Sequence, residues 1–285
     1  MPFKKVTVIG LGLIGGSLAW ALKESKQVEN VYGVDTDRES VDYALGNNMI
    51  DTGSSDPEEG VSDAEIVVIA VRVGAITEVA KSIIPSLTQG TVLTDVGSVK
   101  GDIVNEVENL VPSGIHFVGG HPIAGTERSG AMAGERGLFR GRRVILTPTA
   151  KTDPGARDKV ASLWKAAGSE VHELDMLAHD RIFGFISHLP HVVAYSLIDS
   201  VLNADNSEAL FDFAGGGLGD YTRIAASSPD MWADIFNANK GNVLQAIGEF
   251  KGSLEKIEAA IKSGDRSSLL EILSQASEAK RETVK

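Results

Sequence analysis

The sequence predicts a two-part chain: an α/β domain with a doubly wound, mostly parallel sheet over residues 1–175, then an all-α domain over residues 176–285. Apolar runs without alternation, typical of strands buried on both faces, take turns with helical patterns up to Asp175. From Ala178 onward no run suits a strand. A length of 285 residues fits two domains, and 42% hydrophobic residues are enough for a sizeable core.

The expected strands and helices alternate through the first domain, although no helix is expected between residues 118 and 143. The expected strands are residues 4–9, 30–34, 64–71, 91–95, 116–118, 143–147 and 170–174. The expected helices between them are residues 17–26, 38–47, 75–84, 102–110 and 156–167. In the second domain, residues 181–187, 192–202, 207–213, 231–250, 254–261 and 267–281 suit helices, and the glycine-rich run 215–219 interrupts them.

A G-x-G-x-x-G motif at residues 10–15 lies between the first expected strand and the first expected helix. Gly10 permits a tight turn, and Gly12 lets the backbone approach a pyrophosphate without a Cβ in the way. Gly15 lets the helix pack closely on the strand. Strand, motif, helix and second strand together predict a dinucleotide-binding (Rossmann) domain.

The cofactor expected in this domain is NAD. The backbone N–H groups at the start of the helix, including those of Leu13 and Ile14, would face the phosphates. Asp35 ends the second strand, where its carboxylate would accept hydrogen bonds from both ribose hydroxyls and repel a 2′-phosphate. Arg38 lies close to Asp35, so the strictness of NAD over NADP stays open.

Composition excludes several classes of protein. The net charge is −12 with no basic run, so we expect no nucleic-acid partner. There is no cysteine, which excludes disulfides, thiol catalysis and Cys-ligated zinc. Residues 6–22 are uncharged and follow two lysines, which imitates a signal peptide, but glycines interrupt the run. We expect a cytoplasmic protein with no membrane partner and no other membrane-spanning segment, and a homodimer that covers the apolar helix faces.

Ligands of an open α/β sheet bind beyond the carboxyl ends of its strands. Residues 10–15, 95–100 and 119–127 all follow expected strands, so Ser98 and His121 are expected at the same crevice as a nicotinamide. An imidazole with an ordinary pKa near ~6.5 suits removal of a hydroxyl proton as a hydride leaves. The alternative for His121 is a histidine that satisfies backbone groups in a glycine-rich turn.

Four segments resemble motifs of the prephenate/arogenate dehydrogenase family. They are Gly-Ser-Val-Lys at 97–100, Gly-Gly-His-Pro-Ile-Ala-Gly-Thr-Glu at 119–127, Ser-His-Leu-Pro-His at 187–191 and Asp-Tyr-Thr-Arg-Ile-Ala at 220–225. Together with the residue 10–15 motif and Trp232, the resemblance covers nearly the whole chain. It implies an NAD-dependent oxidoreductase that converts prephenate to 4-hydroxyphenylpyruvate by oxidative decarboxylation, in tyrosine biosynthesis.

The resemblance also implies roles for individual residues. His121 would hydrogen-bond the ring hydroxyl and assist hydride transfer, and Ser98 would contact both that histidine and the hydroxyl at the cofactor. His191 would bind substrate, and Arg223 would hold a substrate carboxylate through its planar guanidinium. Without the resemblance, Arg223 is as well explained by an ion pair with a neighbouring aspartate. Further residues expected to line or gate the pocket are Thr126, Glu127, Gly216, Gly217 and Asp220.

Three other functions stay open at this stage. Arogenate carries an amino group where prephenate has a keto group, and an acidic residue such as Glu127 would favour it. A small β-hydroxyacid dehydrogenase would rely on a lysine of the helical domain, for which Lys240 is the candidate. A non-catalytic NAD-sensing protein would bind the cofactor without turnover.

Several neighbouring residues have simpler interpretations. His188 and His191 are three apart, a spacing seen in metal sites, but no third ligand clusters with them, so no metal is expected. We expect His179 and Asp180 to cap the helical domain at a hinge, and Lys100 to be solvated at a helix start. Tyrosine resembles the product, which makes it a candidate competitive inhibitor. No fused chorismate mutase segment before Met1 and no regulatory domain after Lys285 is expected.

Overall fold

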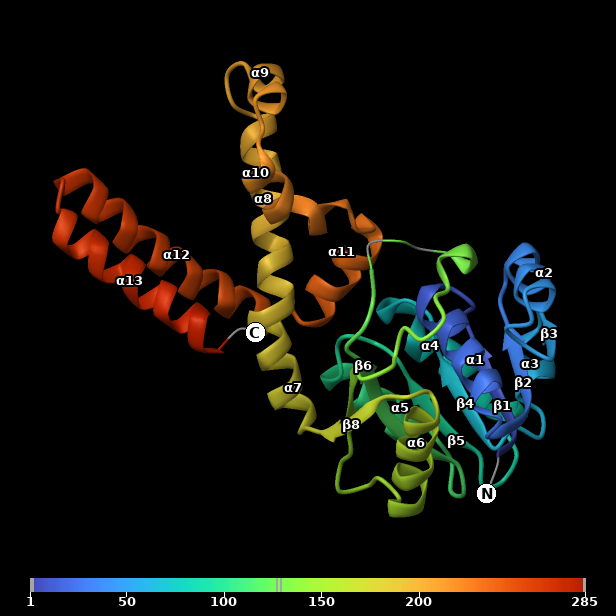
Figure 1. The fold of residues 1–285 in the computed structure, drawn as a ribbon. Coiled ribbons are helices and arrows are strands. Elements are labelled where there is room, and N and C mark those ends of the chain that lie inside the picture. Colours follow the sequence, from blue (N-terminus) through green and yellow to red (C-terminus); the bar gives the residue numbers. More distant parts are fainter. Residues whose placement is uncertain (1–2, 127, 129, 284–285) are drawn as a thin grey trace. The chain divides into compact units, whose positions relative to one another are not determined.

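The computed structural model describes residues 3–126, 128 and 130–283, and contacts divide the chain into two compact units (Figure 1). The first unit is Met1–Asn239 and contains the sheet together with the helices that directly follow it. The second unit is Lys240–Lys285. A boundary near Asp175 between a sheet domain and a helical domain stays a prediction.

The sheet confirms the predicted fold class. Its eight strands lie in the order β3-β2-β1-β4-β5-β6-β7-β8, and every neighbouring pair is parallel except the antiparallel pair β6 and β7. The order runs in opposite directions on the two sides of β1, which places the switch point of a doubly wound sheet between β1 and β4. The strands are β1 (Phe3–Ile9), β2 (Val28–Val34), β3 (Thr52–Ser54), β4 (Ile66–Ile69), β5 (Val92–Asp95), β6 (His116–Pro122), β7 (Arg143–Thr147) and β8 (Glu170–Glu173).

Helices cover both faces of this sheet, which is why its central strands show no polar alternation. Val6 and Val68 belong to one apolar cluster and Val67 and Ile69 to another, so successive residues point to opposite buried faces. The helices α1 (Leu13–Ser25), α2 (Arg38–Gly46) and α6 (Pro154–Ala166) supply the first cluster, and α3 (Pro57–Val61), α4 (Ile76–Ile83) and α5 (Gly101–Leu110) supply the second. Three short 3₁₀ turns are η1 (Val73–Ala75), η2 (Ile84–Ser86) and η3 (Ala131–Ala133).

The apolar run that imitates a signal peptide forms β1 and most of α1. Val6, Val8 and Leu18 are fully buried there. This run is the centre of the sheet domain, which explains its lack of charge.

Four local differences from the sequence prediction have clear causes. β3 and α3 are too short to show a periodicity, and residues 231–250 are two helices because the backbone turns at Asn239. β6 extends beyond the expected residue 118 because residues 119–122 pair antiparallel with β7. Gly119 and Gly120 have no strand propensity that would reveal this pairing in the sequence. A helix, α10, also begins inside the glycine run.

Seven helical segments follow the sheet within the first unit. They are α7 (Met176–Phe183), the π-helical turn η4 (Gly184–His188), α8 (Leu189–Leu202), α9 (Ser207–Asp212), α10 (Gly216–Thr222), the 3₁₀ turn η5 (Arg223–Ala226) and α11 (Pro229–Ala238). Asp175 caps α7 by accepting hydrogen bonds from the Leu177 and Ala178 N–H groups at 3.0 Å. Figure 1 shows α7 and α8 as one continuous rod.

The expectation that no further segment could span a membrane by length and composition is wrong for this rod, Met176–Leu202. Its 27 residues include an 18-residue stretch with a mean hydropathy of 1.2, and 11% of that stretch is buried. Length and composition alone are weak evidence for membrane insertion. The rod also carries the buried pair His179 and Asp180, which is hydrogen-bonded to the sheet domain.

The second unit is a helical hairpin of α12 (Lys240–Ser263) and α13 (Arg266–Thr283). Gly264 has a φ of +65° between the two helices, a conformation that side chains other than glycine rarely adopt. Asp265 then caps α13 by accepting hydrogen bonds from the Ser267 and Ser268 N–H groups at 3.1 Å.

Candidate active site

The glycine motif forms a tight loop at the carboxyl end of β1, where a nucleotide is expected. Gly10 has a φ of +92°, and a Cβ there would lie 2.4 Å from the Ala70 carbonyl oxygen. A Cβ on Gly15 would lie 1.8 Å from the Gly10 carbonyl oxygen, so the helix can approach the turn only with glycine. A Cβ on Gly12 would meet no atom within 4 Å, which leaves open space at the start of α1. These features fit a pyrophosphate-binding loop.

The residues next to the motif present backbone rather than side chain to that space. Leu13 is buried and Ile14 packs against the core, so contact with phosphate would come from their N–H groups, which have no acceptor within the first helical turn. Asp35 accepts hydrogen bonds from Leu11 N at 2.8 Å and Asp37 N at 3.0 Å. Its carboxylate is therefore fixed beside the loop, and its contact with a ribose stays a prediction.

His121 lies near the end of β6, opposite Ile145 of β7. Its Nδ1 is 2.8 Å from His179 Nε2 on α7, and its ring packs edge-on against Phe183 with 4.7 Å between ring centroids. The hydrogen bond spans 58 residues of sequence. His121 is therefore oriented by a histidine that sequence reasoning assigned to a hinge.

His179 in turn contacts Asp180, its neighbour in sequence. His179 Nδ1 is 2.8 Å from Asp180 Oδ1, and the His179 side chain is fully buried. The Asp180 carboxylate also accepts hydrogen bonds from Lys100 N at 2.8 Å and Gly101 N at 2.7 Å, at the start of α5. The expectation that His179 and Asp180 cap the helical domain is wrong, because the cap of α7 is Asp175.

Lys100 is also not where the sequence placed it. Its side chain is fully buried, pairs with the buried Asp95 carboxylate and donates a hydrogen bond to the Gly120 carbonyl at 2.8 Å. Asp95 accepts further hydrogen bonds from Gly97 N at 2.8 Å and Gly120 N at 3.1 Å. The Lys100 side chain bends back beneath the carboxyl ends of β5 and β6 instead of entering solvent. This buried pair ties the residue 95–100 loop to the strand that carries His121.

The electrostatic surroundings keep both central histidines neutral near pH 7. Desolvation by burial, followed by the charges of His179 and Lys100, holds the pKa of His121 well below its usual 6.5. Burial also lowers the pKa of His179, although Asp180 opposes this shift. His121 is therefore available as a proton acceptor at neutral pH.

His191 on α8 is held by a different set of contacts. Its ring stacks on Trp232 of α11 with 3.5 Å between centroids and an interplanar angle of 22°. His191 Nδ1 donates a hydrogen bond to the Ser187 carbonyl at 3.0 Å, which leaves Nε2 for a ligand. α11 packs against η1, directly after β4, so this histidine belongs to elements near the sheet's switch point.

The remaining predicted site residues are less closely joined. Ser98 lies half-buried in the loop after β5, and the hydrogen-bond partner of His121 is His179 rather than Ser98. Thr126 is exposed and accepts a hydrogen bond from Arg128 N at 3.3 Å, while Glu127 lies outside the described residues. The exposed residues Gly216, Gly217, Asp220 and Arg223 lie on α10 and η5, which pack against α8.

His188 has a structural position. It is fully buried, its Nδ1 accepts a hydrogen bond from Asn239 Nδ2 at 3.0 Å, and its Nε2 finds no partner among the described residues. Burial lowers its pKa to about 4. Within residues 3–126, 128 and 130–283, no three potential metal ligands gather in one place.

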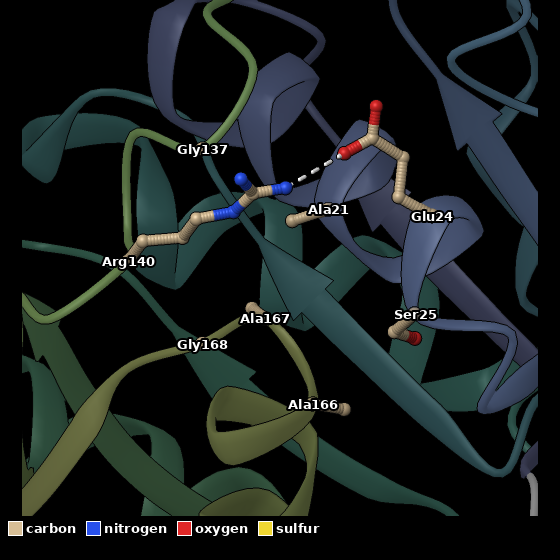
Figure 2. A pocket seen from close by; sticks show the side chains of 8 residues that line it. All are labelled: Ala21, Glu24, Ser25, Gly137, Arg140, Ala166, Ala167 and Gly168. Atoms are coloured by element: carbon tan, nitrogen blue, oxygen red, sulfur yellow. Dashed lines mark hydrogen bonds and ion pairs between the residues drawn. The ribbon is translucent and has the colours of Figure 1, made fainter.

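A shallow pocket elsewhere on the domain does not belong to this site. Figure 2 shows it between α1, the loop before β7 and the end of α6, with Arg140 facing Glu24 at 3.4 Å across it. It lies at the carboxyl end of α1, opposite to the end where the glycine motif begins that helix.

The chain matches two family models and several known proteins. Residues 18–173 match the nucleotide-binding domain of prephenate dehydrogenase, and residues 176–275 match the dimerization domain of prephenate dehydrogenase. A prephenate dehydrogenase of Bacillus subtilis is 36% identical over 266 residues, which cover 93% of this chain and 72% of that protein.

Two solved structures share the fold over nearly their full length. Prephenate dehydrogenase of A. aeolicus, solved with hydroxyphenyl propionate and NAD+, aligns with a TM-score of 0.93 at 38% identity and covers 99% of each chain. Arogenate dehydrogenase of Synechocystis aligns with a TM-score of 0.83 at 26% identity, over 98% of this chain and all of that one.

Proposed function

The chain belongs to the prephenate dehydrogenase family, and we propose that it converts prephenate to 4-hydroxyphenylpyruvate by NAD-dependent oxidative decarboxylation, as a step of tyrosine biosynthesis. The single observation that carries the proposal is His121, a neutral imidazole with a fixed orientation at the carboxyl end of the sheet. It lies at the carboxyl end of the sheet, the same end at which the glycine motif follows β1.

The cofactor is NAD. Gly10, Gly12 and Gly15 shape the loop for its pyrophosphate, with the N–H groups of Leu13 and Ile14 at the helix start. When bound, NAD accepts a hydride from the hydroxyl-bearing carbon of the substrate. Asp35 favours a free ribose 2′-hydroxyl over a 2′-phosphate. Arg38, the residue that left NADP open, is paired with Asp42 at 3.1 Å.

His121 serves as the proton acceptor. Prephenate carries a ring hydroxyl opposite a ring carboxylate, and the hydroxyl proton passes to His121 as the hydride leaves the same carbon. The bond from the ring to the carboxylate then breaks, its electron pair makes the ring aromatic, and carbon dioxide leaves. The ring oxygen takes the proton back, so the reaction releases no net proton. The protein's main tasks are to orient the ring and to hold one proton briefly.

The other predicted residues bind the substrate. His191 binds the substrate, Arg223 holds one of its carboxylates, and Ser98 orients its hydroxyl. Thr126, Glu127, Gly216, Gly217 and Asp220 line the pocket. Arg223→Ala should raise the KM for prephenate by an amount equivalent to about 2–4 kcal/mol, because a substrate carboxylate loses its charged partner. Steady-state kinetics check this, and an unchanged KM would remove Arg223 from the substrate site.

Arogenate is the second candidate substrate. The similarity to an arogenate dehydrogenase of Synechocystis supports it, and the acidic Glu127 would attract the arogenate amino group. The β-hydroxyacid reading has less support, because the family assignment gives no role to Lys240. The match to a dimerization domain supports a homodimer, and a biosynthetic reaction of this type is expected in the cytoplasm.

The test is NADH formation at 340 nm with prephenate and arogenate, each with NAD and with NADP. Turnover of prephenate with NAD is the expected result. A preference for arogenate would move the substrate assignment to the second candidate. Protein that binds NAD but turns over neither substrate would contradict the proposal and favour a sensing role. Added tyrosine is expected to compete with prephenate, and an unchanged rate at high tyrosine would exclude that inhibition.

A further inference from the structure

We propose that His179 and Asp180 are positioning residues that set the proton order of His121, so that its Nε2 is the atom that accepts the substrate's hydroxyl proton. The proposal rests on the proposed function for its chemistry. Its structural basis is a row of three hydrogen-bonded side chains, His121, His179 and Asp180, called the histidine chain below. The distance is 2.8 Å from His121 Nδ1 to His179 Nε2 and 2.8 Å from His179 Nδ1 to Asp180 Oδ1.

The proton order follows from the end of the chain. Both Asp180 oxygens accept backbone N–H groups, from Lys100 and Gly101, as expected for an ionised carboxylate. A carboxylate can only accept, so His179 Nδ1 must carry a proton and donate it to Asp180. In the neutral ring His179 Nε2 is then an acceptor, and His121 Nδ1 must donate to it. The lone pair of neutral His121 is thereby left on Nε2.

Asp180 itself is well fixed for this task. Asp180 is 5% exposed, and its carboxylate reaches from α7 to the start of α5, where two N–H groups and the positive end of the helix dipole favour a negative charge. The carboxylate therefore keeps its role as acceptor independently of the substrate. The hydrogen bonds of the histidine chain also join α7 to β6 and to the start of α5.

The histidine chain explains how His121 can hold a proton for part of the reaction. When Nε2 takes the hydroxyl proton, His121 becomes a cation whose Nδ1–H points at His179. Asp180 lies at the far end of that path with a negative charge to offset it. The other titratable groups around the chain are the buried pair Lys100 and Asp95 from the β5–α5 loop and His188 from η4. Lys100 and Asp95 oppose each other, so Asp180 is the charge that favours the imidazolium.

Asp180→Asn tests the order of protons. The neutral amide removes the charge that makes His179 Nδ1 a donor, and either its oxygen or its NH2 group can face His179, so the tautomers of both rings are no longer fixed. We expect kcat to fall by roughly 10²–10⁴-fold while the Kd for NAD changes less than about 3-fold, and the pH profile of kcat to change. His179→Phe keeps a ring of similar size without nitrogen atoms, and it should lower kcat in the same way if Asp180→Asn fails to fold. The control is His172→Gln, an exposed histidine on β8.

A second measurement needs no substrate. In protein with ¹⁵N-labelled histidine, the ring nitrogen shifts should show His121 and His179 protonated on Nδ1 in the unaltered enzyme, and signal from His121 protonated on Nε2 should appear in Asp180→Asn. His121 protonated on Nε2 in the unaltered enzyme would overturn the proposal, as would a normal kcat in both variants. If the unaltered enzyme turns over no substrate but shows the expected shifts, the proposed function fails and the proton order stands.

Discussion

The glycine loop after β1 and the histidine chain at the end of β6 lie at the same edge of one sheet but are built in opposite ways. The loop consists of backbone, and its shape depends on missing side chains, since a Cβ on Gly15 would lie 1.8 Å from the Gly10 oxygen. The histidine chain consists of side chains from two elements, β6 and α7, held by backbone N–H groups at the start of α5, and it depends on where protons reside. The loop is therefore sensitive to added side-chain volume, whereas the histidine chain is sensitive to side-chain charge and to pH.

His121→Asn should have the largest effect and falls only on the histidine chain. The amide can still donate to His179, but it cannot accept the substrate's proton, so we expect kcat to fall by about 10³-fold. The affinity for NAD should be unchanged because the glycine loop is untouched. Steady-state kinetics and NAD titration measure the two effects, and near-normal turnover would exclude His121 from the reaction.

His188→Asn tests whether a buried histidine near the histidine chain makes the stability of the fold depend on pH. The pKa of His188 is about 4 in the folded protein, against 6.5 when exposed, so the unfolded chain binds its proton first as the pH falls. The folded protein should lose about 3 kcal/mol of stability between pH 6.5 and 4 through this residue. Asparagine can still accept the Asn239 hydrogen bond but does not titrate in this range. Denaturant melts at several pH values should show a shallower slope for the variant, and an equal slope would contradict the assignment.

Gly15→Ala is the corresponding test of the loop. The added methyl group cannot fit beside the Gly10 carbonyl, so the helix must shift by more than an ångström, and we expect a loss of about 1–3 kcal/mol in NAD binding. Gly46→Ala, at the exposed end of α2 where a Cβ meets nothing within 4 Å, is the matched control. Calorimetric titration with NAD measures both variants. Equal affinities would show that the close approach at Gly15 is not needed.

Asp35→Ser should have the smallest effect. Loss of the carboxylate removes the ribose contact and its repulsion of a 2′-phosphate, so the ratio of kcat/KM for NAD over NADP should fall by about 10-fold. Kinetics with both cofactors measure this ratio. A ratio that stays the same would place cofactor choice elsewhere in the domain.

The sequence is sufficient to predict the loop because all its parts are neighbours in the chain. Strand, glycines, helix and Asp35 lie within residues 4–35, and each has a local conformational reason. The buried strands and both helix-covered faces follow equally from local apolar runs. The three-residue β3 and the glycine-rich end of β6 have no such run, so pairing with neighbouring strands alone defines them.

The histidine chain could only be predicted in part, for the opposite reason. His121 was identified from its position after a strand and from a family motif. Its partner His179 lies 58 residues away, and the backbone groups that hold Asp180 lie 80 and 79 residues from it. Nothing local distinguishes a buried Lys100 from a solvated one. The adjacent pair His179 and Asp180, following the last strand, was the one signal available.

Product analysis of a single prephenate reaction tests the central claim most directly. With NAD and purified protein, we expect equal amounts of NADH, carbon dioxide and 4-hydroxyphenylpyruvate, with no net proton released to the buffer beyond carbon dioxide hydration. That result would establish oxidation coupled to decarboxylation at one site. NADH without carbon dioxide, or no NADH from protein that binds NAD, would contradict the account.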